Sequence, residues 1–334
     1  MDSLTQIVLG AAVAEAVVGK NVGNRAMLYG AIAGTIPDLD VLAKNFTDTL
    51  TATEIHRGFT HSILFSLLLA PPLGWLLSKI ERKANLSWKQ WSLMFFLCLV
   101  THPVLDAFTT WGTQLFWPID IRLAFKSIFV IDPLYTLPFL VFLVLTMFQK
   151  RTSPKRQKYN RFGLIVSSSY LLLTVFIKGV AYTSFQNALE QQAISYTQLQ
   201  VKPGPLTTVL WNANVETETS FLIGEYSFFD SQPITFYEYP KNHQLVENLK
   251  ENPDFKRLEN IAQGWYIIEN ENDELYFNDL RFGLLNRDFK RPNFAFSYKV
   301  EETATGSIKI SENEKSRDDA QQLLSDLWKR ILGN

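Results

Sequence analysis

The sequence predicts an α-helical membrane bundle in residues 1–182, followed by a small α+β domain in residues 183–334. Three observations predict this division. The first part contains apolar stretches close to the ~20 residues that cross a bilayer as a helix. The second part has no stretch of that length and alternates short β-prone runs with turn residues. The charge also divides, because the first part carries 17 Lys and Arg against 10 Asp and Glu and the second carries 15 against 23, so their net charges are +7 and −8.

The first part contains four clear candidates for spanning helices, at about residues 59–78, 91–110, 128–148 and 162–182. Two shorter segments precede them, at residues 4–19 and 26–36. Both are rich in Gly and Ala, which let helices pack closely. The first segment is not typical of a signal peptide, because Asp2 replaces the usual basic residues and Glu15 interrupts the apolar run. We therefore expect four transmembrane helices plus two short N-terminal membrane segments.

Basic residues predict which loops face the cytoplasm, because short cytoplasmic loops carry an excess of Lys and Arg. Residues 79–89 contain four basic residues and one acidic residue, and residues 150–161 contain six basic residues and no acidic one. Both loops are predicted to be cytoplasmic, which places residues 38–60, residues 111–127 and the whole second part on the outer face. This predicts a multi-pass protein of the plasma membrane with an extracytoplasmic C-terminal domain.

The second part predicts strands at its β-prone runs and a final helix. The runs are residues 207–211, 221–223, 234–237, 264–268 and 294–298, and residues 314–332 have the apolar spacing of an amphipathic helix. The only cysteine is Cys98, which excludes a disulfide framework or a cysteine-based zinc finger within the chain. The acidic second part, and the lack of a basic block interleaved with aromatic residues, argue against nucleic acid as a partner.

Ionisable side chains in the first part indicate its chemistry, because such groups are costly in or beside apolar helices. Three of the four histidines lie there, accompanied by four of its seven aspartates, and imidazole and carboxylate groups suit zinc and other first-row divalent ions. The set comprises His56, His61, His102, Asp38, Asp40, Asp106 and Asp132. By the loop charges, these residues lie near the outer ends of their helices and converge on one face.

The histidine spacings indicate ligands, although each pattern has an alternative. His102 and Asp106 are four residues apart, which stacks them on one helix face for metal binding or for a hydrogen bond that joins helices. His56 and His61 flank Gly58 where a loop enters a helix, either as ligands or as interfacial aromatic residues.

Three other positions also have two interpretations. Asp38 and Asp40 follow a proline, either as cation ligands or as an ordinary solvated turn at a helix end. Asp132 precedes a proline and either caps the next helix or has a direct role. Arg57 is either an interfacial anchor or a clamp for an anionic substrate.

Four motifs taken together resemble a known family. They are Met-Asp-Ser-Leu-Thr-Gln at 1–6, Pro-Asp-Leu-Asp at 37–40, His-Arg-Gly-Phe-Thr-His-Ser at 56–62 and His-Pro-Val-Leu-Asp-Ala-Phe-Thr-Thr-Trp-Gly at 102–112. Their order and spacing are similar to those of the bacterial membrane-bound metal-dependent hydrolases of the YdjM type. Many members of that family carry a histidine where this chain has Gln6. The resemblance implies a metal site formed by Asp38, Asp40, His56, His61, His102 and Asp106.

Together, the residues and the resemblance predict a membrane-bound hydrolase that depends on a divalent metal ion, with zinc favoured over manganese. A phosphoester or lipid-linked substrate would be cleaved at the outer face, with Arg57 holding phosphate and Asp132 acting as base or supporting a ligand. The number of candidate ligands would also allow two ions. Two alternatives stay open: an ion transporter or metal carrier, and a non-catalytic anchor whose tail domain binds a partner. A transport pathway should show ionisable groups through the full membrane depth, whereas these gather near one face.

Overall fold

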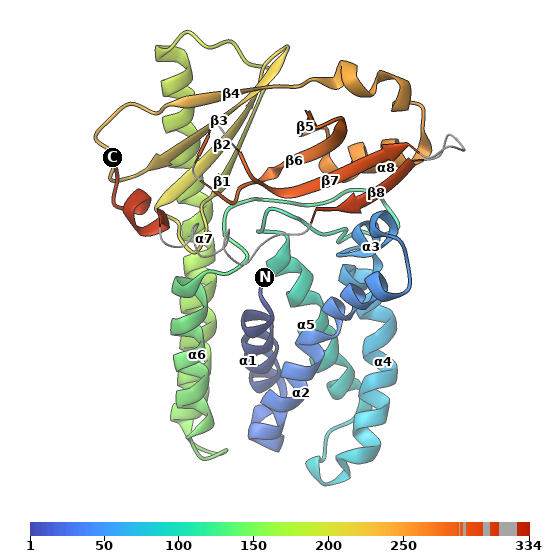
Figure 1. The fold of residues 1–334 in the computed structure, drawn as a ribbon. Coiled ribbons are helices and arrows are strands. Elements are labelled where there is room, and N and C mark those ends of the chain that lie inside the picture. The colour runs from blue at the N-terminus through green and yellow to red at the C-terminus, as the bar shows by residue number, and fades with distance from the viewer. Residues whose placement is uncertain (287, 290–291, 303–307, 314–325) are drawn as a thin grey trace. The chain divides into compact units, whose positions relative to one another are not determined.

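The computed structural model describes residues 1–286, 288–289, 292–302, 308–313 and 326–334. The described chain forms two compact units (Figure 1). The first contains Met1–Ala43 and Ile55–Ile177, and the second contains Lys44–Glu54 and Lys178–Asn334. Helix α7 (Pro154–Gln191) contributes to both units. The assignment of residues 1–182 to a transmembrane domain and of 183–334 to an extracytoplasmic one stays a prediction.

The first unit is helical. Its α-helices are α1 (Ser3–Val22), α2 (Asn24–Thr35), α4 (Ile63–Ile80), α5 (Trp88–Asp106), α6 (Pro133–Met147) and the first part of α7. Shorter helical segments connect them: η1 (Pro37–Asn45), η2 (Phe59–His61) and η3 (Arg82–Ala84). Helix α3 (Thr49–Ile55) lies between η1 and η2 in the chain and belongs to the second unit except for its last residue. Side-chain caps help to set where helices begin, since the Asp2 carboxylate accepts from the Thr5 amide at the start of α1 and Asp132 caps α6.

Two glycines let α1 and α2 pack at backbone contact. A Cβ atom on Gly10 would lie 2.2 Å from the Gly30 carbonyl oxygen, and one on Gly30 would lie 2.1 Å from the Gly10 carbonyl oxygen. A side chain at either position would clash with backbone, which explains the small residues of both segments. Helix α1 also packs against α5 and α6, and its apolar window is 67% buried, against 22% in α4 and 17% in α7. It is therefore the central helix of the first unit.

Within the described residues, α1, α4 and α7 are long and apolar enough to cross a membrane, and a fourth span results if α2 and η1, bent by 44°, count as one. The predicted spans at residues 91–110 and 128–148 correspond to α5 and α6, which are not among these helices. Helix α5 has polar residues at both ends, including Lys89 and His102, and α6 has 15 residues because it begins only after the Asp132 cap. The segment predicted at residues 4–19 is instead a helix of 20 residues. The exact number of spans stays a prediction.

The second unit contains two antiparallel four-stranded sheets, each ordered as in the chain (Figure 1). The first sheet contains β1 (Gln198–Pro203), β2 (Leu210–Glu216), β3 (Ser220–Ser227) and β4 (Phe236–Pro240). The second contains β5 (Tyr266–Glu271), β6 (Glu274–Leu284), β7 (Phe294–Glu302) and β8 (Ile308–Glu312). Both sheets contribute to one apolar core, in which Phe221 and Ile223 pack with Ile267 and Leu280. Segment η4 (His243–Leu249) and helix α8 (Pro253–Ala262) pack in a second core with the second sheet.

A β-sheet domain after the helical region is confirmed, although the strand boundaries differ from those expected. The runs at 221–223, 264–268 and 294–298 lie largely in β3, β5 and β7, whereas the runs at 207–211 and 234–237 become strand only from Leu210 and Phe236. Strands β1, β6 and β8 lie outside the β-prone runs named from the sequence, and β6 carries the buried ion pair of Asp279 and Arg281. Most of the predicted closing helix, residues 314–325, lies outside the described residues. Its end, with Leu327, packs on Leu210.

Candidate metal centre

Three elements of the first unit bring four of the predicted ligands together. Asp38 lies in η1, His61 ends η2, and His102 and Asp106 lie one turn apart near the end of α5. One ligand atom from each residue lies within 4.8 Å of the other three. We call this set, Asp38, His61, His102 and Asp106, the ligand cluster.

Five of the six separations between the atoms of the ligand cluster are similar. The two imidazole Nε2 atoms are 3.2 Å apart, and Asp38 Oδ1 lies 3.3 Å from His61 Nε2 and 3.4 Å from His102 Nε2. Asp106 Oδ2 lies 3.5 Å from each of the same two nitrogens. A tetrahedral zinc site with bonds of ~2.0–2.1 Å has ligand atoms about 3.3–3.4 Å apart. These five separations therefore fit the edges of such a site.

Hydrogen bonds on the far side of each imidazole indicate which nitrogen faces the cluster with a lone pair. His102 Nδ1 lies 2.6 Å from the Gly34 carbonyl oxygen, which can only accept, so this nitrogen carries the hydrogen. His61 Nδ1 lies 3.2 Å from Asp40 Oδ2 and 3.1 Å from Thr60 Oγ1. In the neutral rings, both Nε2 atoms then present lone pairs to the cluster. Four acceptors facing one another repel unless a cation or a proton lies between them.

The surroundings of Asp106 supply donors and positive charge. Gln6 Nε2 donates to Asp106 Oδ1 at 2.9 Å, and the Met1 amino group forms an ion pair with the same oxygen. Arg57 Nε lies 3.2 Å from Asp106 Oδ2. Within the described residues, Asp106 Oδ2 and Arg57 Nε have no hydrogen-bond partner by geometry, so the Oδ2 acceptor is available to a cation. His61, His102 and Asp106 are buried, whereas the Asp38 side chain is 26% exposed, so access to the cluster is past Asp38.

Asp40 and His56 lie next to the ligand cluster but outside it. Asp40 Oδ1 lies 2.9 Å from His56 Nδ1. Its other oxygen, Oδ2, accepts from the Arg57 amide at 2.8 Å and from Thr60 Oγ1 at 2.9 Å, and also contacts His61 Nδ1. An ionised carboxylate has about four acceptor positions. Donors therefore fill the positions of Asp40 Oδ2 and one position of Oδ1, and the contact with Nδ1 makes Asp40 an orienting group for His61.

The two residues predicted to act on substrate differ in their positions. Arg57 is buried beside Asp106, its Nη1 donates to Thr109 Oγ1 at 2.9 Å, and its φ of 59° is in the left-handed region that disfavours side chains. The Asp132 carboxylate instead accepts from two amides at the start of α6 and from the Tyr170 hydroxyl at 3.1 Å. The structure thus places Asp132 in the helix cap, one of its two sequence-based interpretations, and its direct role stays a prediction.

Two residues that orient the ligands were not predicted as site residues. The Gly34 carbonyl orients His102, and a backbone atom carries no residue-type signal. Gln6 contacts both Asp106 and the His102 carbonyl oxygen, and its place in the first motif was the available signal.

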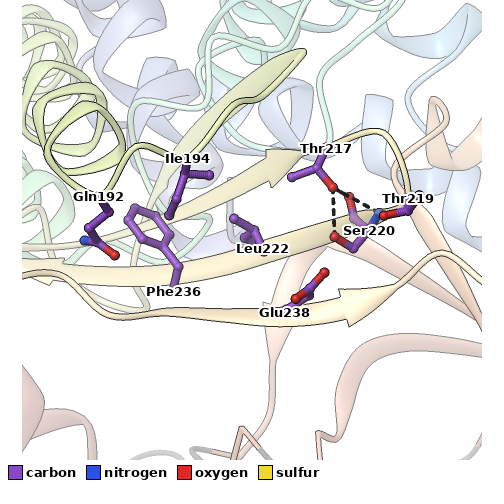
Figure 2. A pocket seen from close by; sticks show the side chains of 8 residues that line it. All are labelled: Gln192, Ile194, Thr217, Thr219, Ser220, Leu222, Phe236 and Glu238. Atoms are coloured by element: carbon purple, nitrogen blue, oxygen red, sulfur yellow. Dashed lines mark hydrogen bonds between the residues drawn. The ribbon is translucent and has the colours of Figure 1, made fainter.

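A surface pocket in the second unit is another candidate for binding, shown in Figure 2. At about 350 Å³, it lies near the lower end of the range for small-molecule pockets. Its lining residues are Gln192, Ile194, Thr217, Thr219, Ser220, Leu222, Phe236 and Glu238. Glu238 is the only ionisable side chain among them, and Thr217 and Ser220 bond to each other (Figure 2). The pocket therefore lacks the group of titratable residues that the ligand cluster provides.

The apolar helices and the buried His/Asp cluster indicate a membrane protein with a candidate metal site. Comparison with known sequences identifies its family. A sequence model of the YdjM inner membrane protein matches residues 1–182, so the chain belongs to this inner membrane protein family. The chain is also 33% identical over 93 residues to Inner membrane protein YbcI of Escherichia coli (strain K12). That match covers 28% of this chain and 52% of the relative, so the chain spans about half the length of this curated relative. No solved structure matches the chain.

Proposed function

We propose that this chain is a membrane-bound hydrolase that depends on one divalent cation, with zinc favoured over manganese. The observation that carries the proposal is the convergence of four acceptor atoms with near-tetrahedral separations in the ligand cluster. Two imidazoles and two carboxylates also suit these ions chemically. When bound, such a cation would lower the pKa of a water molecule toward ~7 and polarise the scissile group.

The chain's own residues would orient the ligands and the substrate. Asp40 and the Gly34 carbonyl hold the two imidazoles, and Gln6 holds Asp106. Arg57 is the proposed contact for the negative charge of a phosphoester, because its guanidinium lies beside the cluster and suits phosphate oxygens. A direct role for Asp132 would require its carboxylate to leave the cap of α6. One ion accounts for the cluster, because its four ligand atoms form a single group and Asp40 and His56 lie outside it.

We further propose that the site faces the outer side of the membrane and acts on a phosphoester or lipid-linked substrate. The support comes from the hairpin of α4 and α5. The ligand cluster lies where α4 begins and α5 ends, whereas the basic loop with Arg82 and Lys83 joins the opposite ends of the same helices. If that loop is cytoplasmic by the charge rule, the ligand cluster faces outward. A reactive site at the end of apolar helices then favours a substrate that resides in the bilayer.

Metal analysis of the detergent-purified protein tests the proposal. We expect about one equivalent of zinc or manganese in the wild type, since one tetrahedral site is available. The folded double variant His102→Ala, Asp106→Ala should lose the metal, whereas the matched variant His243→Gln, which changes a histidine of the second unit, should retain it. A wild type free of metal after purification without chelators would refute the proposal. Loaded protein is then assayed on phospholipids and lipid-linked phosphates.

Cysteine labelling tests the orientation. Cys98 is buried, so cysteines introduced at the exposed positions Lys155 and Glu218 can be compared in intact cells. A membrane-impermeant maleimide should label Glu218→Cys in the second unit and leave Lys155→Cys unlabelled until the cells are opened. Labelling of Lys155→Cys alone would reverse the proposed orientation.

A further inference from the structure

We infer that Asp40 and His56 form a proton-transfer pair beside the ligand cluster, in which His56 contacts the substrate and does not bind the metal. The inference rests on the proposed function and deepens it. It begins with Asp40, whose Oδ2 accepts from Thr60 Oγ1 and the Arg57 amide and contacts His61 Nδ1, and whose Oδ1 lies 2.9 Å from His56 Nδ1. Asp40 is thus held by protein donors on both oxygens and contributes no atom to the ligand cluster.

The contacts of His56 fix the direction of its ring. Asp40 is an acceptor, so His56 Nδ1, 2.9 Å from Asp40 Oδ1, carries the hydrogen and Nε2 of the neutral ring keeps its lone pair. The ring packs edge-on against Trp111 with centroids 5.4 Å apart, and the His56 carbonyl accepts from Arg122 Nη1 at 3.1 Å. The imidazole is thus oriented by a carboxylate on one nitrogen, as in an activated catalytic histidine.

Exposure separates His56 from the two histidines of the ligand cluster. The His56 side chain is 29% exposed, whereas those of His61 and His102 are 0% and 1% exposed. Its ring centroid lies 6.2 Å from that of His61, and it contributes no atom to the ligand cluster. His56 is therefore close to the cluster yet open to solvent, which suits a group that exchanges a proton with water or substrate.

The proton transfers in hydrolysis of a phosphoester balance with His56 alone. His56 Nε2 accepts a proton from the attacking water while the water oxygen forms its bond to phosphorus. The bond between phosphorus and the leaving oxygen then breaks, and Nε2 returns the proton to that oxygen, so the ring is neutral before and after. The Asp40 carboxylate stabilises the transient imidazolium and keeps the ring in place, which makes Asp40 a positioning residue.

Zinc binding tests the assignment without a turnover assay. We expect His56→Gln to bind zinc with nearly the affinity of the wild type, because no ligand atom is lost. Asp40→Asn should weaken zinc binding by about 10–100-fold, the usual effect of removing a carboxylate that orients a ligand histidine. His61→Gln serves as the ligand control and should lose binding. Loss of zinc in folded His56→Gln would overturn the inference.

Chemical modification gives a second readout on the zinc-loaded wild type. Diethylpyrocarbonate acylates an accessible imidazole nitrogen that has a lone pair, and mass spectrometry locates the adduct. We expect modification at His56 and protection of His61 and His102. Protection of His56 by zinc would show that it is a ligand and would overturn the inference.

Turnover of bis(4-nitrophenyl) phosphate completes the test. Zinc-loaded His56→Gln should show a kcat about 10²–10⁴-fold below wild type with KM little changed, the size of a general acid–base contribution. An unchanged kcat in the loaded variant would overturn the inference. Metal-free wild type counts instead against the proposed function, so the two failures are distinguishable.

Discussion

Replacing Glu15 by Gln should destabilise the helical unit strongly, because Glu15 forms a buried ion pair with Arg156. Arg156 Nε and Nη2 each lie 2.6 Å from a Glu15 oxygen, and the two side chains are 3% and 2% exposed. Breaking such a pair typically costs about 3–5 kcal/mol, since it leaves a buried charge unpaired. Arg156 keeps hydrogen bonds to Asn24 Oδ1 and the Gln149 carbonyl, so we expect the lower end, about 3 kcal/mol.

The measurement is reversible unfolding in mixed micelles with increasing SDS, followed by circular dichroism. The double variant Glu15→Gln, Arg156→Gln should lose less than the two single losses added, because neither charge is then orphaned. Arg82→Gln is the matched control: it removes an exposed arginine of the same unit and should change the unfolding free energy by at most about 0.5 kcal/mol. A loss below about 1 kcal/mol in Glu15→Gln, or strict additivity in the double variant, would refute the reasoning.

Three further predictions follow from single features. Asp132→Ala should cost about 0.5–2 kcal/mol in the same unfolding assay, as for a lost helix cap, and should leave the bound metal unchanged; a fall in metal content would show a direct role instead. Gly30→Ala should push α1 and α2 apart at this contact, since its Cβ would meet the Gly10 carbonyl at 2.1 Å, and should lower the yield of folded, monodisperse protein. Burial lowers the pKa of His243, which stacks on Tyr266, so its neutral form favours the folded state. Stability of the second unit is therefore present at neutral pH and falls as pH drops through the ordinary histidine pKa, and His243→Gln should flatten the pH dependence of the melting temperature between pH 7 and about 5.

Residue type predicted the helical region and the later sheets, because apolar length and β-prone runs are local signals. Local signals did not show which helix lies at the centre of the first unit. The sequence predicted only a short membrane segment for α1, which is rich in small residues. Those residues allow it to lie at the centre of the unit, where Gly10 contacts Gly30. Strand β6 was missed for a related reason, since Asp279 and Arg281 interrupt its apolar pattern but bond to each other when buried. Both errors arise where a partner satisfies a residue that looks unfavourable alone, a distant one for Gly10 and one two residues away for Asp279.

The candidate site shows the same limit at finer scale. Sequence spacing named all four residues of the ligand cluster, because His and Asp at the ends of apolar helices are a strong chemical signal. It could not separate these ligands from Asp40 and His56, which have the same residue types. That separation depends on which donors surround each carboxylate. Both oxygens of Asp40 have protein donors, whereas Asp106 Oδ2 has no hydrogen-bond partner in the described part of the chain.

The central position of α1 links packing to the chemistry of the cluster. Its close approach to α2 sets the position of Gly34, and the Gly34 carbonyl in turn fixes the ring of His102. Gln6, on α1 itself, holds Asp106. Two of the four ligands are thus oriented by segments that contribute little metal-binding chemistry of their own. Loss of metal after a change in the α1–α2 contact would therefore reflect misplaced hydrogen-bond partners. The metal affinity of folded Gly30→Ala, which retains all four ligands, measures this effect separately from loss of the ligands themselves.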